Sequence, residues 1–221
     1  MGKRVLYILV CALIFFSMLS IFFIFYAQPQ KTLPKSITGA AQNGGLSIII
    51  EGGKCQVINL VQGWNFISIY SKQSNYSISN IFSPITGFYD YLLEWNSSSQ
   101  EFNAWSSAGA QSFTVLNENK SYFIYMSQAQ NLTICGRPYG NKTFNLVYGW
   151  ESPDYIYEFP SNVTNNTFYG INFSYIQKWN IIAQDFLVYS PSAPTNPFNQ
   201  ISPSEGYFIF TSGGNLIYVR T

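Results

Sequence analysis

The feature that most constrains how this chain folds is an internal repeat of about 85 residues. Four short segments recur in one order at offsets of 84 to 86 residues: LVQGW at 60–64 as LVYGW at 146–150, WN at 95–96 as WN at 179–180, EFxxWS at 101–106 as DFxxYS at 185–190, and YFIY at 122–125 as YFIF at 207–210. Such self-similarity indicates two tandem copies of one supersecondary unit. We expect the join near 137–140, with one module at 46–137 and the other at 138–221.

Short β-prone runs separated by turn residues fill both copies. Strands are predicted at 55–61, 65–70, 88–95, 121–126, 132–135, 175–179, 186–189, 206–210 and 216–219. Strands of this length and spacing are typical of sandwich-like or barrel-like antiparallel all-β modules. Two segments, 77–82 and 164–169, lack strand alternation and are each predicted to form one helical turn.

The repeated segments resemble a known kind of domain. The order Leu-x-x-Gly-Trp-Asn, then a mid-module Trp, then a Tyr-Phe strand is similar to the small Gly-Trp-Asn-type β module that recurs on secreted and cell-surface proteins of archaea and bacteria. The quoted residues are Gly63-Trp64-Asn65, Trp95, Trp105 and Ser121-Tyr122-Phe123 in the first copy, and Gly149-Trp150, Trp179 and Gly206-Tyr207-Phe208 in the second. Glu151 departs from the pattern, because it stands where the first copy has Asn65. The resemblance, over about residues 55–220, implies an extracellular all-β architecture and brings no catalytic residues.

The stretch 5–26 (VLYILVCALIFFSMLSIFFIFY) holds 22 residues without a charge, Gly or Pro. As a helix it would be about 33 Å long, which matches a bilayer hydrocarbon core of about 30 Å. Because Lys3 and Arg4 lie on its short N-terminal side, we expect residues 1–4 in the cytoplasm and the rest of the chain outside. A cleavable signal peptide is the alternative, although cleavage after Ala27 would place Phe25 where a small residue is usual.

Two further segments precede the repeats. Residues 27–45 combine Gln, Pro and Gly with small residues and show no apolar period, which predicts a flexible linker. Leu46–Ile50 (LSIII) is a β-prone run closed by Gly52-Gly53 and is predicted to be a strand. It would add either to its own sheet or to the edge of a neighbouring molecule, as in filament subunits.

The composition excludes several classes of function. The chain has no His, so Ser-His-Asp and Cys-His catalysis and imidazole-ligated metals are ruled out. Eleven basic and ten acidic residues leave no electrostatic footprint for nucleic acid. From residue 36 onward, seven basic residues stand against ten acidic ones, so the predicted exterior part carries a net charge of −3. Aromatic residues at 19 % and charged residues at 10 % predict a folded chain rather than a disordered one.

The cysteines and glycosylation sequons both suit the outside of a cell. Cys11 lies in the apolar stretch, whereas Cys55 opens the first module and Cys135 closes it, so an oxidising setting predicts a disulfide between these two. Two separate buried thiols are the alternative. Eight Asn-x-Ser/Thr sequons are candidates for glycosylation, unless they only reflect turn composition: Asn75, Asn96, Asn119, Asn131, Asn141, Asn162, Asn165 and Asn172.

The aromatic residues divide into expected core residues and candidate ligand contacts. A position repeated in both copies is usually a core position, and four tryptophans occupy such positions: Trp64 with Trp150, and Trp95 with Trp179. Trp105 and its counterpart Tyr189 precede Ser-containing turns. They are the better candidates for contact with a sugar ring.

The carboxylates offer little basis for catalysis or metal binding. Glu94 and Glu101 flank Trp95, and the second copy holds a different cluster of acids (Glu151, Asp154 and Glu158), so neither arrangement is repeated. Paired carboxylates would be needed for glycoside hydrolysis, and Ca²⁺ binding by Glu151 and Asp154 lacks EF-hand spacing. We therefore expect no enzyme activity, no cofactor and no metal.

These features predict a membrane-anchored cell-surface protein whose two extracellular β modules act by contact, in a structural, display or adhesive role. Two alternatives are a carbohydrate-binding surface module that uses Trp105 and Tyr189, and a subunit of a surface filament or surface layer. The expected partners are the membrane, surface glycans and other surface proteins.

Overall fold

The computed structural model describes residues 53–109, 111–163, 168 and 170–218, all of which belong to one compact unit. The predicted anchor at 5–26, linker at 27–45 and strand at 46–50 lie outside the described residues, as do Asn165 and most of the helical turn predicted at 164–169. Within the described ranges, no helix is both long and apolar enough to cross a bilayer.

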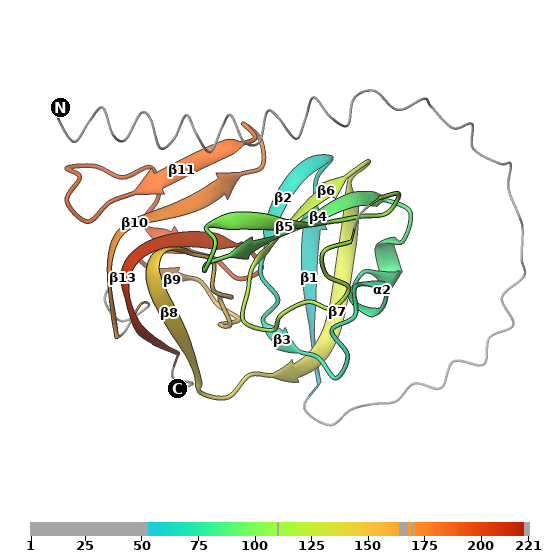
Figure 1. Cartoon of the computed structure of the whole chain (residues 1–221), viewed down its shortest axis with the longest axis horizontal. Coiled ribbons are helices and arrows are strands. Elements are labelled where there is room, and N and C mark those ends of the chain that lie inside the picture. Colours follow the sequence, from blue (N-terminus) through green and yellow to red (C-terminus); the bar gives the residue numbers. More distant parts are fainter. Residues whose placement is uncertain (1–52, 110, 164–167, 169, 219–221) are drawn as a thin grey trace, which may run out of the picture. The chain divides into compact units, whose positions relative to one another are not determined.

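The described residues form an antiparallel all-β fold (Figure 1). The first repeat contains β1 (Lys54–Leu60), β2 (Gly63–Ile67), β3 (Ser71–Lys72), α2 (Ile78–Ile81), a 3-10 turn (Ser83–Ile85), β4 (Tyr89–Asn96), β5 (Glu101–Ser106), β6 (Tyr122–Met126) and β7 (Gln130–Pro138). The second contains β8 (Lys142–Glu151), β9 (Ser161–Asn162), β10 (Ile171–Asn180), β11 (Asp185–Tyr189), β12 (Gln200–Ile201) and β13 (Tyr207–Tyr218). The helical turn predicted at 77–82 is confirmed as α2, which buries Ile78 and Ile81.

The two repeats share one strand order. In the first, four strands pair in the order β2-β6-β4-β5, and a second sheet has the order β1-β7-β3. In the second, a single sheet has the order β8-β13-β10-β11, and β9 pairs with β12. By the offset of the sequence repeat, β8 corresponds to β1 followed by β2, and β13 to β6 followed by β7. The sequence repeat is therefore a repeat of sheet topology.

One long strand, β13, replaces two that the sequence predicted separately, at 206–210 and 216–219. Gly213 and Gly214 lie between them and look like a turn in the sequence. Both glycines adopt positive φ, 91° and 127°, and the pairing with β8 keeps one register across them, from Ile209 opposite Glu151 to Tyr218 opposite Lys142. The pairing with β10 is irregular here, because its register shifts between Phe173, opposite Thr211, and Ile171, opposite Gly214. The glycines thus lie at an irregularity on the β10 side and do not end the strand.

Three apolar clusters hold the fold together. One lies within the first repeat and one within the second. The third is shared: Phe66, Leu93, Trp95 and Phe123 of the first repeat bury their side chains with Phe208 of the second. The other three repeated tryptophans are half-buried and pack against this shared cluster, which confirms their expected core role: Trp64, Trp150 and Trp179.

The shared cluster lies on a pseudo-two-fold axis that relates the repeats. Phe123 and Phe208, which occupy equivalent positions, contact each other with ring centroids 6.3 Å apart. Ser68 and Asp154 are also equivalent, and the Ser68 hydroxyl lies 3.1 Å from Asp154 Oδ1. Equivalent residues can meet in this way only near a two-fold axis, as in the isologous interface of a homodimer.

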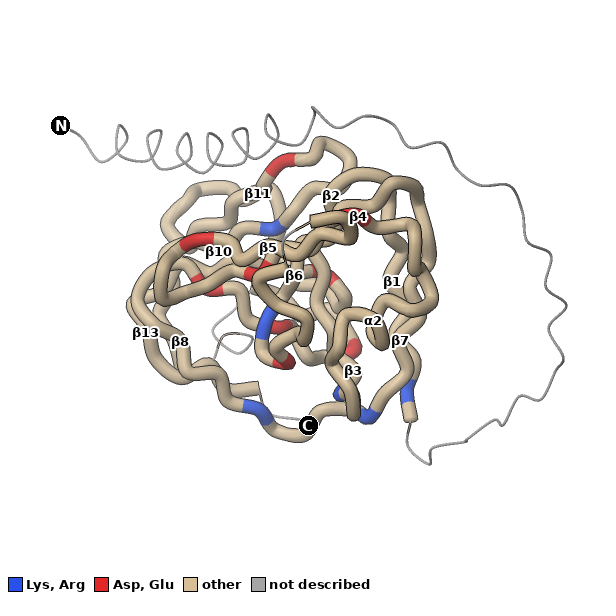
Figure 2. Tube along the Cα trace, turned by 45° about the vertical axis from the view of Figure 1, so that its right-hand side comes forward, with Lys and Arg blue, Asp and Glu red and all other residues tan. Residues whose placement is uncertain are grey.

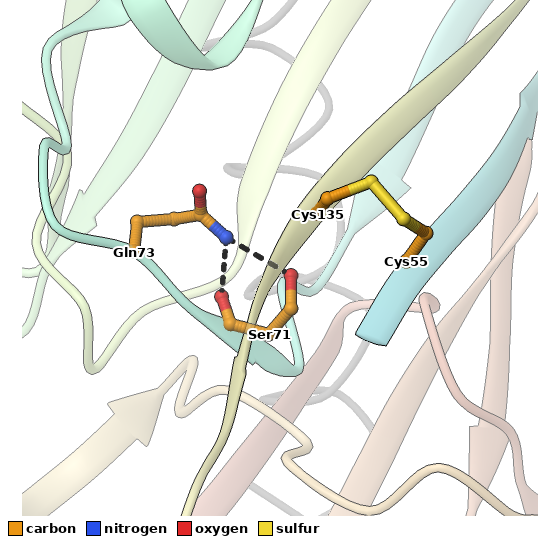
Figure 3. Close-up of a disulfide and its surroundings, with 4 residues drawn as sticks. All are labelled: Cys55, Ser71, Gln73 and Cys135. Atoms are coloured by element: carbon orange, nitrogen blue, oxygen red, sulfur yellow. Dashed lines mark hydrogen bonds between the residues drawn. A yellow bond between two sulfur atoms is a disulfide. The ribbon is translucent and has the colours of Figure 1, made fainter. Parts of the chain in front are cut away.

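The predicted disulfide joins Cys55 on β1 to Cys135 on β7 (Figure 3). The two residues are directly paired across the antiparallel strands, with Cα atoms 3.9 Å apart. Beside them, the Gln73 side-chain amide donates hydrogen bonds to the carbonyl oxygen and the hydroxyl of Ser71, at 2.8 Å and 3.1 Å. The disulfide closes a separation of 80 residues and ties the first repeat's opening strand to its last.

Candidate functional site

Each repeat binds the Gly-Trp segment of the other through a glutamine side chain at an equivalent turn. The Gln184 side chain, after the β10–β11 turn, accepts a hydrogen bond from the Trp64 N–H at 2.8 Å and donates one to the Trp64 carbonyl at 3.0 Å. Gln100, after the β4–β5 turn, makes the same two bonds to Trp150, at 2.9 Å and 3.1 Å. We call these paired contacts the glutamine clasp.

Two indole N–H groups donate to the same Trp64 and Trp150 carbonyl oxygens that the clasp glutamines bind. Trp179 Nε1 donates to the Trp64 carbonyl at 2.9 Å, and Trp95 Nε1 donates to the Trp150 carbonyl at 2.8 Å. A buried indole N–H needs such an acceptor. The repeated tryptophans therefore orient the two repeats in addition to burying apolar surface.

The glycines before Trp64 and Trp150 make room for the clasp. Gly63 and Gly149 have φ values of 93° and 118°, a region that residues with a Cβ rarely adopt. An added Cβ would lie 2.9 Å from Gln184 Oε1 at Gly63 and 2.9 Å from Gln100 Oε1 at Gly149. Glycine is required at both positions because it permits the backbone conformation and the approach of the glutamine.

We expect Gln184→Ala and Gln100→Ala each to lower the free energy of unfolding by about 1–2 kcal/mol. Each substitution leaves the backbone N–H of a half-buried residue, Trp64 or Trp150 respectively, without its acceptor. Chemical denaturation of the full chain in detergent micelles, followed by Trp fluorescence, measures the change. Gln62→Ala, which removes one exposed hydrogen bond to the Ser127 carbonyl, is the control and should stay within about 0.5 kcal/mol. If both clasp variants lose no more unfolding free energy than Gln62→Ala does, the clasp adds no stability.

Two grooves related by the pseudo-two-fold axis lie where the clasp turns meet the neighbouring repeat. The Ile groove, of about 410 Å³, is lined by Val57, Asn59, Ile181, Ile182 and Glu205 among others. The Ser groove, of about 360 Å³, presents the equivalent residues Thr143, Asn145, Ser97, Ser98 and Lys120. The same backbone scaffold thus carries two different sets of side chains.

An ion pair at equivalent positions reverses its polarity between the repeats. In the first repeat, Lys120 Nζ lies 3.4 Å from Glu94 Oε1 and 2.6 Å from the Trp95 carbonyl. In the second, Lys178 Nζ lies 2.7 Å from Glu205 Oε2. The cation and the carboxylate have exchanged their equivalent positions while the pair is kept. Lys178 and Glu205 both line the Ile groove, whereas of the other pair Lys120 alone lines the Ser groove.

Glu151, the residue that departs from the Gly-Trp-Asn pattern, keeps one hydrogen bond that Asn65 makes. Asn65 Oδ1 accepts a hydrogen bond from the Val61 N–H at 2.9 Å, and Glu151 Oε1 accepts one from the Val147 N–H at 2.7 Å. Glu151 is buried and also accepts a hydrogen bond from the Ser97 hydroxyl in the Ser groove. Asn65 Nδ2 also donates to the Val61 and Gly63 carbonyls, at 2.8 Å and 3.1 Å, so the carboxylate of Glu151 replaces only the acceptor half of the amide.

The other carboxylates are engaged separately. Glu94 accepts a hydrogen bond from the Tyr122 hydroxyl at 2.9 Å, and Glu101 is exposed at the start of β5. Asp154 is buried beside Ser68, and Glu158 pairs with Lys54 at the edge of a hollow of about 280 Å³. Among the described residues, no three His, Cys, Asp or Glu side chains are grouped as metal ligands would be. Figure 2 shows the few basic and acidic positions interspersed along the described trace.

The two predicted ligand contacts, Trp105 and Tyr189, lie on the equivalent strands β5 and β11 but pack in different clusters. The Trp105 ring stacks on Tyr89 with centroids 5.4 Å apart. The Tyr189 ring lies 5.8 Å from that of Phe198. Both side chains are half-buried, and neither lines the Ile groove or the Ser groove. Their contact with sugars remains a prediction.

The sequon asparagines lie mostly at the surface. Asn96 is half-buried at the β4–β5 turn, where its Oδ1 accepts a hydrogen bond from the Ser98 N–H at 3.0 Å. Of the described sequons, six have exposed asparagines: Asn75, Asn119, Asn131, Asn141, Asn162 and Asn172. Exposure is needed for a glycan, so these six positions are compatible with modification.

Asp154 is a fully buried carboxyl on the pseudo-two-fold axis. Its burial raises its pKa well above the ordinary value, although the nearby Lys142 charge and hydrogen bonds from Ser68 and the Ile69 N–H act in the opposite direction. Burial likewise lowers the pKa of Lys142. The folded protein therefore holds a proton on Asp154 more tightly than the unfolded chain does.

We expect Asp154→Asn to flatten the dependence of stability on pH. Because the folded pKa is raised, the contribution of Asp154 to stability is fully present below its unfolded pKa of about 4 and is lost as the pH rises through the folded pKa. Urea denaturation at a series of pH values above 4 should show a decline for the wild type and a smaller decline for the variant. Asp185→Asn, at an exposed position, controls for the loss of one carboxylate. A variant whose profile declines as steeply as the wild type would contradict this account.

Comparisons with known proteins do not extend this description. No family model, no curated protein and no solved structure matches the chain. The resemblance to the Gly-Trp-Asn-type module therefore stays a prediction. The clasp residues Gln100 and Gln184 were missed in the sequence, yet a longer alignment of the repeats, W-N-x-x-x-Q-[ED]-F, contains them.

Proposed function

We propose that this chain is a non-enzymatic, membrane-anchored cell-surface protein whose two β repeats act by contact with other molecules. In this proposal residues 5–26 anchor the chain, residues 1–4 are cytoplasmic, and residues 27–45 carry two sandwich-like repeats away from the membrane. The role is structural, adhesive or one of display.

The Cys55–Cys135 disulfide is the observation that carries the proposal. Disulfides persist in secreted and cell-surface proteins and are rare in the reducing cytosol. The exposed sequon asparagines add support, since glycans are attached to exterior surfaces. The apolar 22-residue stretch adds a means of attachment.

The test combines location and covalent state. Intact cells that produce the protein are treated with a protease that cannot cross the membrane, and the native protein is then analysed by intact mass before and after reduction. We expect the repeats to be digested from outside, residues 1–26 to be retained, the disulfide to be present and at least one sequon to carry a glycan. Repeats protected in intact cells but digested after lysis, together with free Cys55 and Cys135 thiols, would overturn the proposal.

A further inference from the structure

The Ile groove and the Ser groove differ in their capacity to carry glycans. The Ser groove is lined by the asparagines of two sequons, Asn96-Ser97-Ser98 and Asn119-Lys120-Ser121. At the equivalent positions the Ile groove has Asn180-Ile181-Ile182 and Ser204-Glu205-Gly206, and neither triplet is a sequon. The two grooves share one backbone scaffold. Sequon asparagines line the Ser groove, whereas none lines the Ile groove.

Apolar side chains are exposed where the Ile groove opens. Ile182 is 91 % exposed, Val57 54 % and Ile181 41 %. The turn that carries the two isoleucines has serines in the other repeat, with the same backbone hydrogen bonds: Asn180 Oδ1 accepts from the Ile182 N–H at 3.0 Å, as Asn96 Oδ1 does from the Ser98 N–H. The turn therefore does not need isoleucine for its own geometry. Exposed apolar groups that the fold does not require point to a binding surface.

The Ile groove is also lined by residues 57–60 of β1, a strand at the edge of its sheet. In the described part of the chain, β1 pairs with β7 alone and so has one open edge. Cys55 and Cys135 form a closely spaced pair, which in antiparallel strands is the kind without mutual hydrogen bonds. By alternation, Val57 and Asn59 also direct their N–H and C=O groups to the open edge. These groups can accept another strand.

We propose that the Ile groove is a docking site for an extended peptide strand of a partner protein, which pairs with the open edge of β1 and sets apolar side chains against Val57, Ile181 and Ile182. The inference rests on the proposed function and deepens it by naming the surface and the kind of partner. Strand addition suits this groove because its lining combines the open edge of β1 with exposed apolar side chains. Lys178 and Glu205, which both line the groove, neutralise each other in an ion pair.

The test measures binding of a fluorescein-labelled peptide, KTVTVTVK, to the full chain in lipid nanodiscs by fluorescence anisotropy, with empty nanodiscs as the blank. A second peptide, KTVPVTVK, lacks one N–H and cannot pair as a regular strand. We expect the first peptide to bind at least tenfold more tightly than the second. Equal affinities, or no binding of the first peptide below about 1 mM, would overturn the proposal.

Variants at the Ile groove locate the site. Ile182→Asn makes the turn polar without creating a sequon and should weaken binding about tenfold. Ile182→Ser creates a new sequon that begins at Asn180. When this variant is made in a host that glycosylates it, its affinity for the peptide should fall below that of the same variant made without glycans. Tyr148→Ser removes another exposed apolar side chain, which lies outside the groove, and should change nothing. An unchanged affinity in Ile182→Asn would overturn the assignment.

A peptide with the chain's own sequence at residues 44–53 forms the last arm. If this peptide binds more tightly than KTVTVTVK, the docked strand comes from a second copy of this chain. That result would overturn the proposal that the strand belongs to another protein. These measurements use purified protein and do not depend on where the protein resides. A failure of docking is thereby distinct from a failure of the surface location, which the protease experiment reports.

Discussion

Phe123→Ala should lower the free energy of unfolding by about 3–5 kcal/mol, the usual cost of emptying a buried aromatic site. The Phe123 side chain is 1 % exposed and lies in the cluster shared by both repeats. Its ring stacks on Phe66 of the same repeat with centroids 4.2 Å apart and meets Trp179 of the other at 5.3 Å. The substitution therefore removes contacts within one repeat and between the two.

Denaturation of the full chain, followed by Trp fluorescence and by far-ultraviolet circular dichroism, measures this effect. We expect both signals to change in one transition, in the wild type and in the variant, because neither repeat buries its aromatic face without the other. Phe144→Ala is the matched control, because it also removes a buried phenylalanine ring. Phe144 is 4 % exposed, but it belongs to the cluster within the second repeat and not to the shared cluster. Two separate transitions in the wild type, or a loss below about 1 kcal/mol in Phe123→Ala, would contradict the shared core.

Removing the disulfide should have an effect of similar size. Cys55→Ala with Cys135→Ala opens a loop that spans a separation of 80 residues, and the chain-entropy model gives about 4 kcal/mol for a loop of that length. Both cysteines are exposed, so alanine leaves no buried cavity, and the change reports mainly on the unfolded chain. Urea denaturation of the double variant beside the wild type measures it.

The same loss should follow when dithiothreitol reduces the wild-type protein, and the double variant should not respond to the reductant. Cys11→Ala, which removes the cysteine of the apolar stretch, should leave the stability and its response to reductant unchanged. If reduction leaves the wild-type midpoint within error, the disulfide does not contribute to stability.

Much of the local structure was determined by the sequence alone. The β-prone run at 55–61 predicted β1, and the positions of Cys55 and Cys135 at the two ends of one repeat predicted the disulfide. These features follow from local residue patterns and from chemistry that does not depend on the path of the chain between them. The repeat itself also predicted which tryptophans belong to the core.

Only the tertiary structure decided how the repeats combine. Gly213-Gly214 resembles a turn in the sequence but lies inside one strand, because pairing with β8 continues across it in one register. Gln184 resembles any polar turn residue until the pseudo-two-fold axis brings it to the Trp64 backbone, 120 residues away.

The same holds for Ile181 and Ile182, which line a groove only because packing brings β1 of the other repeat to the same hollow. Sequence patterns record which face of an element is buried. The partner of that face depends on long-range packing, which no local pattern contains.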